Sequence, residues 1–316
     1  MLWKRVQQRL FNFTYMLFPN TLKQGSKIAI IAPAGRLADG ALKEAEQALT
    51  SWGLEVISGR HVYDQNSYFA GLDNDRLSDL QWALDDLEID AILFARGGYG
   101  TTRILDDIDF SKLKNHPKWL IGFSDITALH LKLQTLGIAS IHGPMGTSFG
   151  IKDGFNSIEA LKKILINGNL DLISALPSSR AGVVEAEVTG GNLALIVDSL
   201  GTSSEIDTNN KILFLEEVGE KTYRIDRMFR QLLRAGKLNN LAGLVVGHFS
   251  LIDDGDTPFG QSWKEVIEEV TKPFAYPVAF GFNIGHEPEN RPIIVGGVYQ
   301  LKAREGSSIL TMKINY

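Results

Sequence analysis

The sequence predicts an α/β protein with a parallel sheet in its first half and a second half that is richer in β structure. In the first half, short apolar runs alternate with stretches of helical spacing, which is typical of a parallel sheet covered by helices on both faces. Beyond residue 182, several strand-like runs share the chain with only two or three helical stretches. The length of 316 residues favours two domains over one.

The first half begins with a strand followed by a helix. The run KIAIIA, residues 27–32, is short, apolar and β-branched, and the turn residues that follow it end it, as expected for a buried parallel strand. Apolar residues then recur at helical spacing between Leu42 and Trp52, with Gly53 as a C-cap. Further strands are expected at 91–95 and 119–123, and further helices at 77–87, 126–136 and 157–166.

A loop between Pro177 and Gly182 contains the turn residues expected of a linker. We therefore predict an N-terminal extension over residues 1–22, an α/β domain over 23–175 and a smaller, β-rich domain over 183–316. Strands of the last part are expected at 183–188, 211–215, 243–248, 292–298 and 309–314.

The composition excludes several classes of function. The net charge of −5 lacks the basic excess that binding to a phosphate backbone requires, so nucleic acid is not an expected partner. The absence of Cys removes disulfides, thiolate zinc sites and a Cys nucleophile, and it is compatible with a reducing, cytoplasmic location. No two of the six His residues have the i, i+4 spacing of a helical zinc site, so no metal is expected.

The segment from Met1 to Pro19 is basic and apolar, as the start of a signal peptide would be. Asn12 and Thr14 interrupt its apolar stretch, and no cleavage site of small residues follows before Lys23. We interpret it as an extension packed on the surface or as the product of an upstream start codon, with a helix on a membrane surface as the alternative. No window of about 18 uncharged apolar residues occurs, so a membrane-spanning helix is not expected.

Two turns at the carboxyl ends of expected parallel strands are candidate sites, because ligands bind beyond these strand ends. In Gly122-Phe123-Ser124-Asp125, a strand runs directly into a helix, which is the geometry of a nucleophile elbow with Ser124 exposed at the helix N-terminus. The second Gly of the G-x-S-x-G pattern is missing, since Ile126 stands there. On this local pattern alone, a simple N-cap role for Ser124 is favoured.

The other turn, Arg96-Gly97-Gly98-Tyr99-Gly100, is rich in glycine. Glycines let backbone N–H groups approach a ligand or an oxyanion closely. A phosphate cradle has little support, because the Lys-Ser/Thr pair of a P-loop is absent. A plain tight turn explains the spacing equally well.

Two histidines and two glutamates are candidates for acid–base chemistry. His286 lies in an expected loop, where an imidazole is more often functional than in a core, and His142 at a strand end is the rival general base. Glu216 and Glu217 close a strand-like run, so one carboxylate points to each face of the strand. A solvated strand end and a solvated loop histidine are the alternative interpretations.

An ordered set of motifs resembles the LD-carboxypeptidases and the related microcin C immunity peptidases. The resemblance extends from about residue 28 to 297. Its motifs are ARGGYGTTRIL from Ala95, IGFSDITALH from Ile121, HGPM from His142, GGNLALIVDSLGT from Gly190, LFLEEVGEKTYRIDRMFRQL from Leu213 and GHE from Gly285. Each motif is weak alone, and the ordered set is highly specific.

The resemblance implies a Ser-His-Glu triad in a cleft between two domains. Ser124 would be the nucleophile, His286 the general base and Glu216 the residue that orients the imidazole. The resemblance also implies an oxyanion hole of the Gly98 and Asp125 N–H groups. It places further residues near the substrate, namely Arg96, Gly97, Tyr99 and Asn192. It implies a doubly wound, flavodoxin- or Rossmann-like first domain, a homodimer and no cofactor.

The expected function is that of a serine carboxypeptidase that hydrolyses the LD-peptide bond before a terminal D-alanine in murein tetrapeptides, during cell-wall recycling in the cytoplasm. The alternative enzyme is a microcin C-type immunity peptidase that cleaves an aminoacyl-nucleotide amide bond, and it would use the same triad. An alternative of another class is a non-catalytic protein that binds small anions through the turn at Arg96 and an arginine-rich helix after Glu217.

Overall fold

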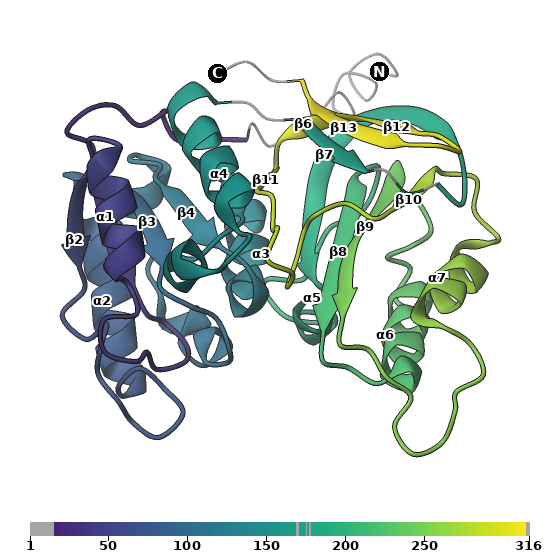
Figure 1. The fold of residues 1–316 in the computed structure, drawn as a ribbon, viewed down its shortest axis with the longest axis horizontal. Helices are drawn as coiled ribbons and strands as arrows, with labels where there is room; N and C mark the ends of the chain where they lie inside the picture. Colours follow the sequence, from purple (N-terminus) through teal and green to yellow (C-terminus); the bar gives the residue numbers. More distant parts are fainter. Residues whose placement is uncertain (1–15, 169–170, 175, 177, 314–316) are drawn as a thin grey trace, which may run out of the picture.

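The computed structural model describes residues 16–168, 171–174, 176 and 178–313, and it contains two sheets that lie side by side (Figure 1). The first sheet has six strands in the order β11-β5-β4-β3-β1-β2. Its strands are β1 (Lys27–Ile31), β2 (Glu55–Ser58), β3 (Ile89–Phe94), β4 (Trp119–Gly122), β5 (Ser140–His142) and β11 (Ile293–Val295). Neighbours among β1 to β5 pair in parallel, and this order, 2-1-3-4-5, is that of the flavodoxin-like doubly wound fold, so the predicted fold class is confirmed.

The helices of this part alternate with its strands, as the sequence predicts. The α-helices are α1 (Lys43–Ser51), α2 (Asp73–Asp85), α3 (Thr127–Thr135) and α4 (Phe155–Asn167). Short 3₁₀ helices cover Thr101–Arg103, Leu105–Asp107, Lys112–Lys114, Ser124–Ile126 and Gly146–Gly150.

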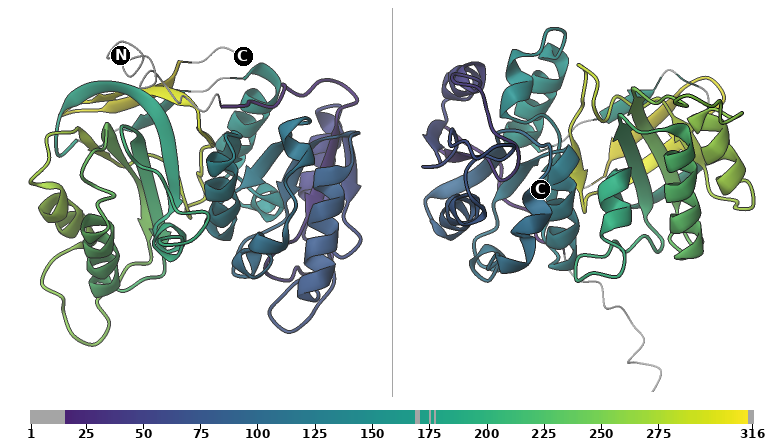
Figure 2. Two further views of the ribbon diagram at one scale, coloured as in Figure 1. Left: turned by 180° about the vertical axis from the view of Figure 1, so that it is seen from behind. Right: turned by 90° about the horizontal axis from the view of Figure 1, so that it is seen from below.

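The second sheet has seven strands in the order β10-β9-β8-β7-β12-β13-β6. The strands are β6 (Asp171–Ser174), β7 (Gly182–Asn192), β8 (Ile212–Val218), β9 (Gly243–Ser250), β10 (Val278–Phe280), β12 (Val298–Ala303) and β13 (Ser308–Met312). The four strands from β10 to β7 pair in parallel. The pairs β7·β12, β12·β13 and β13·β6 are antiparallel. The helices are α5 (Leu193–Asp198), α6 (Thr222–Arg234) and α7 (Trp263–Thr271), and the green α6 and α7 lie on the side away from the first sheet (Figure 2).

The two sheets share one core. In β1, Ile28 and Ile30 face this shared core, while the alternate residues Ala29 and Ile31 face a separate core under α2. In β8, Phe214 belongs to the shared core, and Leu213 and Leu215 pack instead with α6 and α7. The side of β8 that carries Phe214 therefore faces the first sheet.

The chain passes between the two sheets more often than the sequence suggests. The single strand expected at 292–298 is wrong, because a turn at Gly296, with a φ of +88°, separates β11 of the first sheet from β12 of the second. Strand β6 lies within the range 23–175 predicted for the first domain, yet it pairs with β13 in the second sheet. The domain boundaries stay a prediction.

The predicted N-terminal extension is only partly described, since residues 1–15 lie outside the described residues. The Leu17 N–H donates to the Gly137 carbonyl at 2.7 Å, and Leu22 is buried with its N–H bonded to the Leu165 carbonyl. The start of the described chain therefore contacts the turn after α3, through Leu17, and the helix α4, through Leu22. Among the described residues, no helix has the length and hydropathy needed to cross a membrane.

Candidate active site

Ser124 lies at the sharp turn between β4 and the helical segment that leads into α3. Its φ is +63°, in the left-handed region that residues other than glycine seldom adopt. Such backbone strain costs about 1–2 kcal/mol and clusters at functional sites. The sequence predicts the turn, and the structure adds the strained conformation that a simple N-cap does not require.

The glycine-rich turn after β3 lies directly against Ser124. A Cβ placed on Gly97 would come 3.1 Å from the Ser124 Cβ and 3.5 Å from the Asp125 backbone nitrogen. Because these distances leave little room for a side chain, Gly97 allows the two turns to approach each other. The close approach of this backbone to the serine is therefore a feature of the fold.

His286 and Glu216 come from the second half of the chain and complete a line of hydrogen bonds to Ser124. The His286 Nε2 lies 3.0 Å from the Ser124 Oγ, and its Nδ1 lies 2.7 Å from the Glu216 Oε2. Glu216 is fully buried in β8, on the same side as Phe214. Three residues that are widely separated in the sequence thus form one continuous hydrogen-bonded chain.

The loop that carries His286 is held close to Glu216 by a glycine. Gly285 has a φ of +124°, and a Cβ there would lie 2.7 Å from the Glu216 Oε2. The Gly285 N–H donates to the Asn290 side-chain oxygen at 2.9 Å, which closes the loop on itself. Both features fix the position of the imidazole relative to the carboxylate.

The environment of His286 makes it a stronger base than an ordinary histidine. Burial lowers the pKa of His286, but the hydrogen bond and the charge of Glu216 outweigh burial and raise the pKa above its usual value. Since the Nδ1–H donates to the carboxylate, the neutral imidazole presents Nε2 to the serine as an acceptor. This arrangement can remove the proton from the Ser124 hydroxyl.

Glu217 points to the opposite side of β8 and serves a structural purpose. Its carboxylate accepts hydrogen bonds from the Asn192 side-chain amide, the Ala194 N–H and the Val218 N–H, at 2.8–2.9 Å. Burial raises the pKa of Glu217 to about 7, against these hydrogen bonds, which lower it. Glu217 therefore ties the end of β7 and the start of α5 to β8.

Asn192, predicted as a substrate residue, is buried and occupied by internal contacts. Its side-chain oxygen accepts from the Leu195 N–H at the start of α5, and its amide nitrogen donates to Glu217. Its backbone N–H donates to the Thr127 hydroxyl of α3 at 3.0 Å. These contacts make Asn192 a link between the two halves of the chain.

The remaining predicted residues differ in burial and in their contacts. The buried Asp125 carboxylate accepts from the Thr101 N–H at 2.8 Å, so this side chain is used within the fold and only its backbone N–H is close to Gly97. Arg96 donates to the Arg36 carbonyl at 2.9 Å. Gly98 and Tyr99 are exposed, on the surface of the same turn.

His142, the rival general base, is fully buried beneath the site. Its Nε2 lies 4.0 Å from the Glu216 Oε1, and neither ring nitrogen has a hydrogen-bond partner among the described residues. Burial, and the nearby His130 and His286, lower the pKa of His142 well below its usual value. The contact with the serine is made by His286 instead.

A cavity of about 290 Å³ adjoins His286 and was not predicted from the sequence. Its walls are largely apolar, and its lining residues include Phe123, Pro144, Ile151, Ile158 and Asn290. The Asn290 side-chain nitrogen is buried and has no hydrogen-bond partner among the described residues. The cavity therefore has mainly apolar walls, and Asn290, with its unpaired amide nitrogen, is one of its lining residues.

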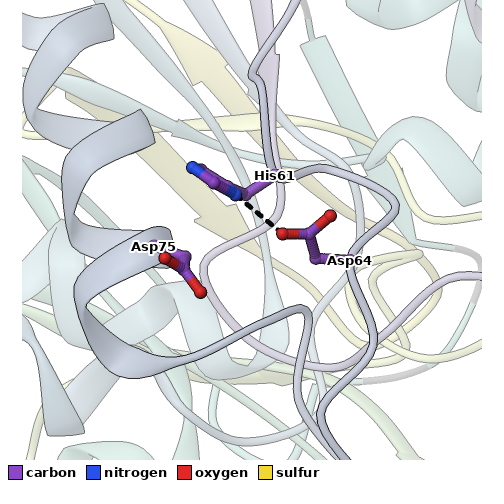
Figure 3. Close-up of side chains that lie close together, drawn as sticks. All are labelled: His61, Asp64 and Asp75. Atoms are coloured by element: carbon purple, nitrogen blue, oxygen red, sulfur yellow. Dashed lines mark hydrogen bonds and ion pairs between the residues drawn. The ribbon is translucent and has the colours of Figure 1, made fainter.

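A group with the donor types of a metal site lies elsewhere (Figure 3). His61 and Asp64, in the loop after β2, form a pair at 2.7 Å, and Asp75 comes from α2. The Asp75 carboxylate already accepts from the Leu72 N–H at the start of this helix, at 2.9 Å. None of the three residues belongs to the hydrogen-bonded chain at Ser124.

Known protein families and curated proteins resemble this chain over most of its length. Residues 28–143 match the LD-carboxypeptidase N-terminal domain, and residues 185–301 match the LD-carboxypeptidase C-terminal domain. A probable murein peptide carboxypeptidase of Bacillus subtilis is 36% identical over 95% of this chain and 96% of its own length. A murein tetrapeptide carboxypeptidase of Pseudomonas aeruginosa is 30% identical over 84% of this chain and 89% of its own.

Solved structures show the same architecture. The muramoyltetrapeptide carboxypeptidase of Oxalobacter formigenes superposes with a TM-score of 0.83 at 30% identity, covering 91% of this chain and 99% of that one. The microcin C7 self immunity protein reaches a TM-score of 0.85 at 21% identity, over 94% and 99% of the two chains, and this likeness concerns the fold alone. The chain belongs to the LD-carboxypeptidase family.

Proposed function

We propose that this protein is a serine carboxypeptidase that hydrolyses the LD-peptide bond before a terminal D-alanine in murein tetrapeptides. The hydrogen-bonded chain from Ser124 through His286 to Glu216 is the observation that carries the proposal. A serine is a weak nucleophile unless an adjacent base activates it, and that base needs an acidic partner to hold its tautomer.

The proposed reaction proceeds through an acyl-enzyme. The Ser124 Oγ attacks the peptide carbonyl carbon while the His286 Nε2 takes the hydroxyl proton, and Glu216 stabilises the imidazolium that forms. When the tetrahedral intermediate collapses, the C–N bond breaks and His286 gives its proton to the leaving amine of D-alanine. Water, activated by the same histidine, then hydrolyses the ester and regenerates the Ser124 hydroxyl.

The oxyanion of the tetrahedral intermediate requires hydrogen-bond donors. We assign this role to the backbone N–H groups of Gly98 and Asp125, as the family resemblance implies. The approach of Gly97 to Ser124 and to the Asp125 nitrogen, with separations of 3.1 and 3.5 Å from its ideal Cβ position, supports a donor pair at this place. The N-terminal end of α3 adds a favourable partial positive charge.

Two features could receive the substrate. The cavity beside His286 would hold one of the two residues that flank the scissile bond, with the free Asn290 amide as a donor to a substrate oxygen. Arg96 or an arginine of the second half would pair with the terminal carboxylate, because guanidinium binds carboxylates in bidentate fashion. Gly97 and Tyr99 of the same turn would line the approach to this group.

The substrate assignment draws on relatives that are named for murein peptides and are 30% or more identical to this chain. The microcin-type activity remains an alternative, whose solved representatives share the fold. The proposal also includes the cytoplasm as the location, cell-wall recycling as the process and a homodimer as the assembly.

Release of free D-alanine from a purified murein tetrapeptide tests the proposed function. We expect rapid release from the natural peptide and almost none from a matched peptide that ends in L-alanine, because the proposed site requires a D residue after the scissile bond. Equal cleavage of the two peptides would refute this substrate. Cleavage of an aminoacyl sulfamoyl nucleotide without any release of D-alanine would establish the alternative activity.

A further inference from the structure

His142 is a buried residue of the first sheet, next to the strands that lead to Ser124 and follow His286. It ends β5, where it pairs with Gly122 of β4, two residues before Ser124, and with Ile293 of β11, shortly after the loop of His286. Its ring packs edge-on against Phe214 at a centroid distance of 5.0 Å. The residue thus lies where the strands that carry the proposed nucleophile and the base meet.

Three polar atoms in this buried region lack partners among the described residues: both ring nitrogens of His142 and the Oε1 of Glu216. The second buried histidine, His130, cannot supply them, because its ring nitrogens already contact the Ser140 hydroxyl and the Gly122 carbonyl, both at 2.8 Å. A buried polar group without a hydrogen bond is costly, so unpaired atoms this close to each other are expected to pair.

The unpaired atoms are complementary. The Glu216 Oε1 is an acceptor, and a neutral imidazole carries one N–H. The low pKa that burial gives His142 keeps its ring neutral, so the attraction does not require a second charge in the core. The distance of 4.0 Å between the His142 Nε2 and the Glu216 Oε1 exceeds a hydrogen bond by about 1 Å, a gap that a small rotation of the His142 side chain would close.

We propose that His142 is a positioning residue that donates its Nε2–H to the Glu216 Oε1 and thereby holds the carboxylate in place for His286. Glu216 then uses both oxygens, one for each imidazole. Without the second donor, the carboxylate can turn about its last bond and lose the 2.7 Å contact with the His286 Nδ1. The inference rests on the proposed function, since it assigns a supporting role within the same reaction.

Three substitutions at one position separate this role from simple packing. His142→Gln places an amide N–H close to the position of Nε2, whereas His142→Asn places it close to the position of Nδ1, and His142→Leu has no donor. We expect kcat for D-alanine release to stay within about threefold of wild type in the Gln variant. In the Asn and Leu variants, kcat should fall roughly ten- to a hundredfold, because this is the rate loss that corresponds to one hydrogen bond to a charged group. KM should stay unchanged.

The thermal midpoint of each variant serves as the control for folding. If Leu does not fold, the Gln and Asn pair carries the test, because these side chains bear the same amide and differ by one methylene. A wild-type kcat in both His142→Asn and His142→Leu would overturn the inference. It would also be overturned if kcat fell in all three variants, His142→Gln included, in proportion to the fall in their thermal midpoints. If wild type releases no D-alanine, the proposed function fails and this inference fails with it.

Discussion

Replacing Glu216 by Gln should remove most of the activity while leaving the shape of the site unchanged. In the wild-type protein, the Glu216 Oε2 accepts a hydrogen bond of 2.7 Å from the His286 Nδ1 and balances the charge of the imidazolium during the reaction. An amide either turns its own N–H toward that nitrogen or offers a neutral oxygen, so the tautomer or the charge balance is lost.

The magnitude follows from the burial of the pair. Because Glu216 is fully buried, water does not replace the lost charge, and a comparable acid-to-amide change in a serine protease costs about 10⁴ in kcat. We expect kcat for D-alanine release to fall by roughly 10² to 10⁴, which corresponds to about 3–5 kcal/mol of transition-state stabilisation. KM should change little, because the carboxylate lies behind the imidazole.

Glu217→Gln is the matched comparison, since it makes the same acid-to-amide change at the next residue of β8. Its activity should fall by less than about tenfold. Its free energy of unfolding should fall by about 1–3 kcal/mol, because an amide cannot accept all three hydrogen bonds that the carboxylate receives. If Glu217→Gln is the inactive variant and Glu216→Gln stays near wild type, the proposed orienting residue is misassigned.

Four further outcomes are expected. Ser124→Gly should be about 1 kcal/mol more stable than Ser124→Ala in thermal unfolding, because the φ of +63° is strained for alanine and free for glycine; equal stability would contradict the strain. The acid limb of kcat/KM should lie above pH 6.5, since Glu216 raises the pKa of His286, and should move to lower pH in Glu216→Gln. EDTA should leave D-alanine release unchanged, because the activated serine needs no metal; loss on chelation with recovery on adding metal would overturn the mechanism. Asn290→Asp keeps an acceptor for the Gly285 N–H but removes the free donor, so KM should rise several-fold with kcat nearly unchanged; an unchanged KM would show that the cavity does not bind substrate.

The sequence was informative where chemistry depends on local patterns. The alternation of strands and helices predicts the first sheet, and period-2 alternation in β8 predicts that Glu216 and Glu217 face opposite sides. The structure separates the two side chains as this alternation requires. The ordered motifs of the family point to Ser124, Glu216 and His286, and in the structure their side chains lie within hydrogen-bond distance of one another along one chain.

The features that the sequence missed depend on contacts between distant segments. The run 292–298 is apolar throughout, so its division between two sheets at Gly296 leaves no mark in periodicity. Asn192 sits in a family motif, and only the fold shows that its amide is used to hold Glu217. The three hydrogen bonds that the Glu217 carboxylate accepts also leave no mark in the sequence, because their donors come from β7, α5 and the backbone of β8.

The proposed mechanism requires Ser124 as the nucleophile, and D-alanine release by Ser124→Ala tests this role most directly. Alanine has the same Cβ and the same backbone restrictions as serine, so the variant keeps the strained turn and loses only the hydroxyl that His286 contacts. Removal of the nucleophile from a catalytic triad costs roughly 10⁶ in kcat in a serine protease. We predict that Ser124→Ala, folded as shown by a wild-type thermal midpoint, releases no D-alanine above the uncatalysed background. A variant that keeps a tenth of wild-type activity would contradict the assignment.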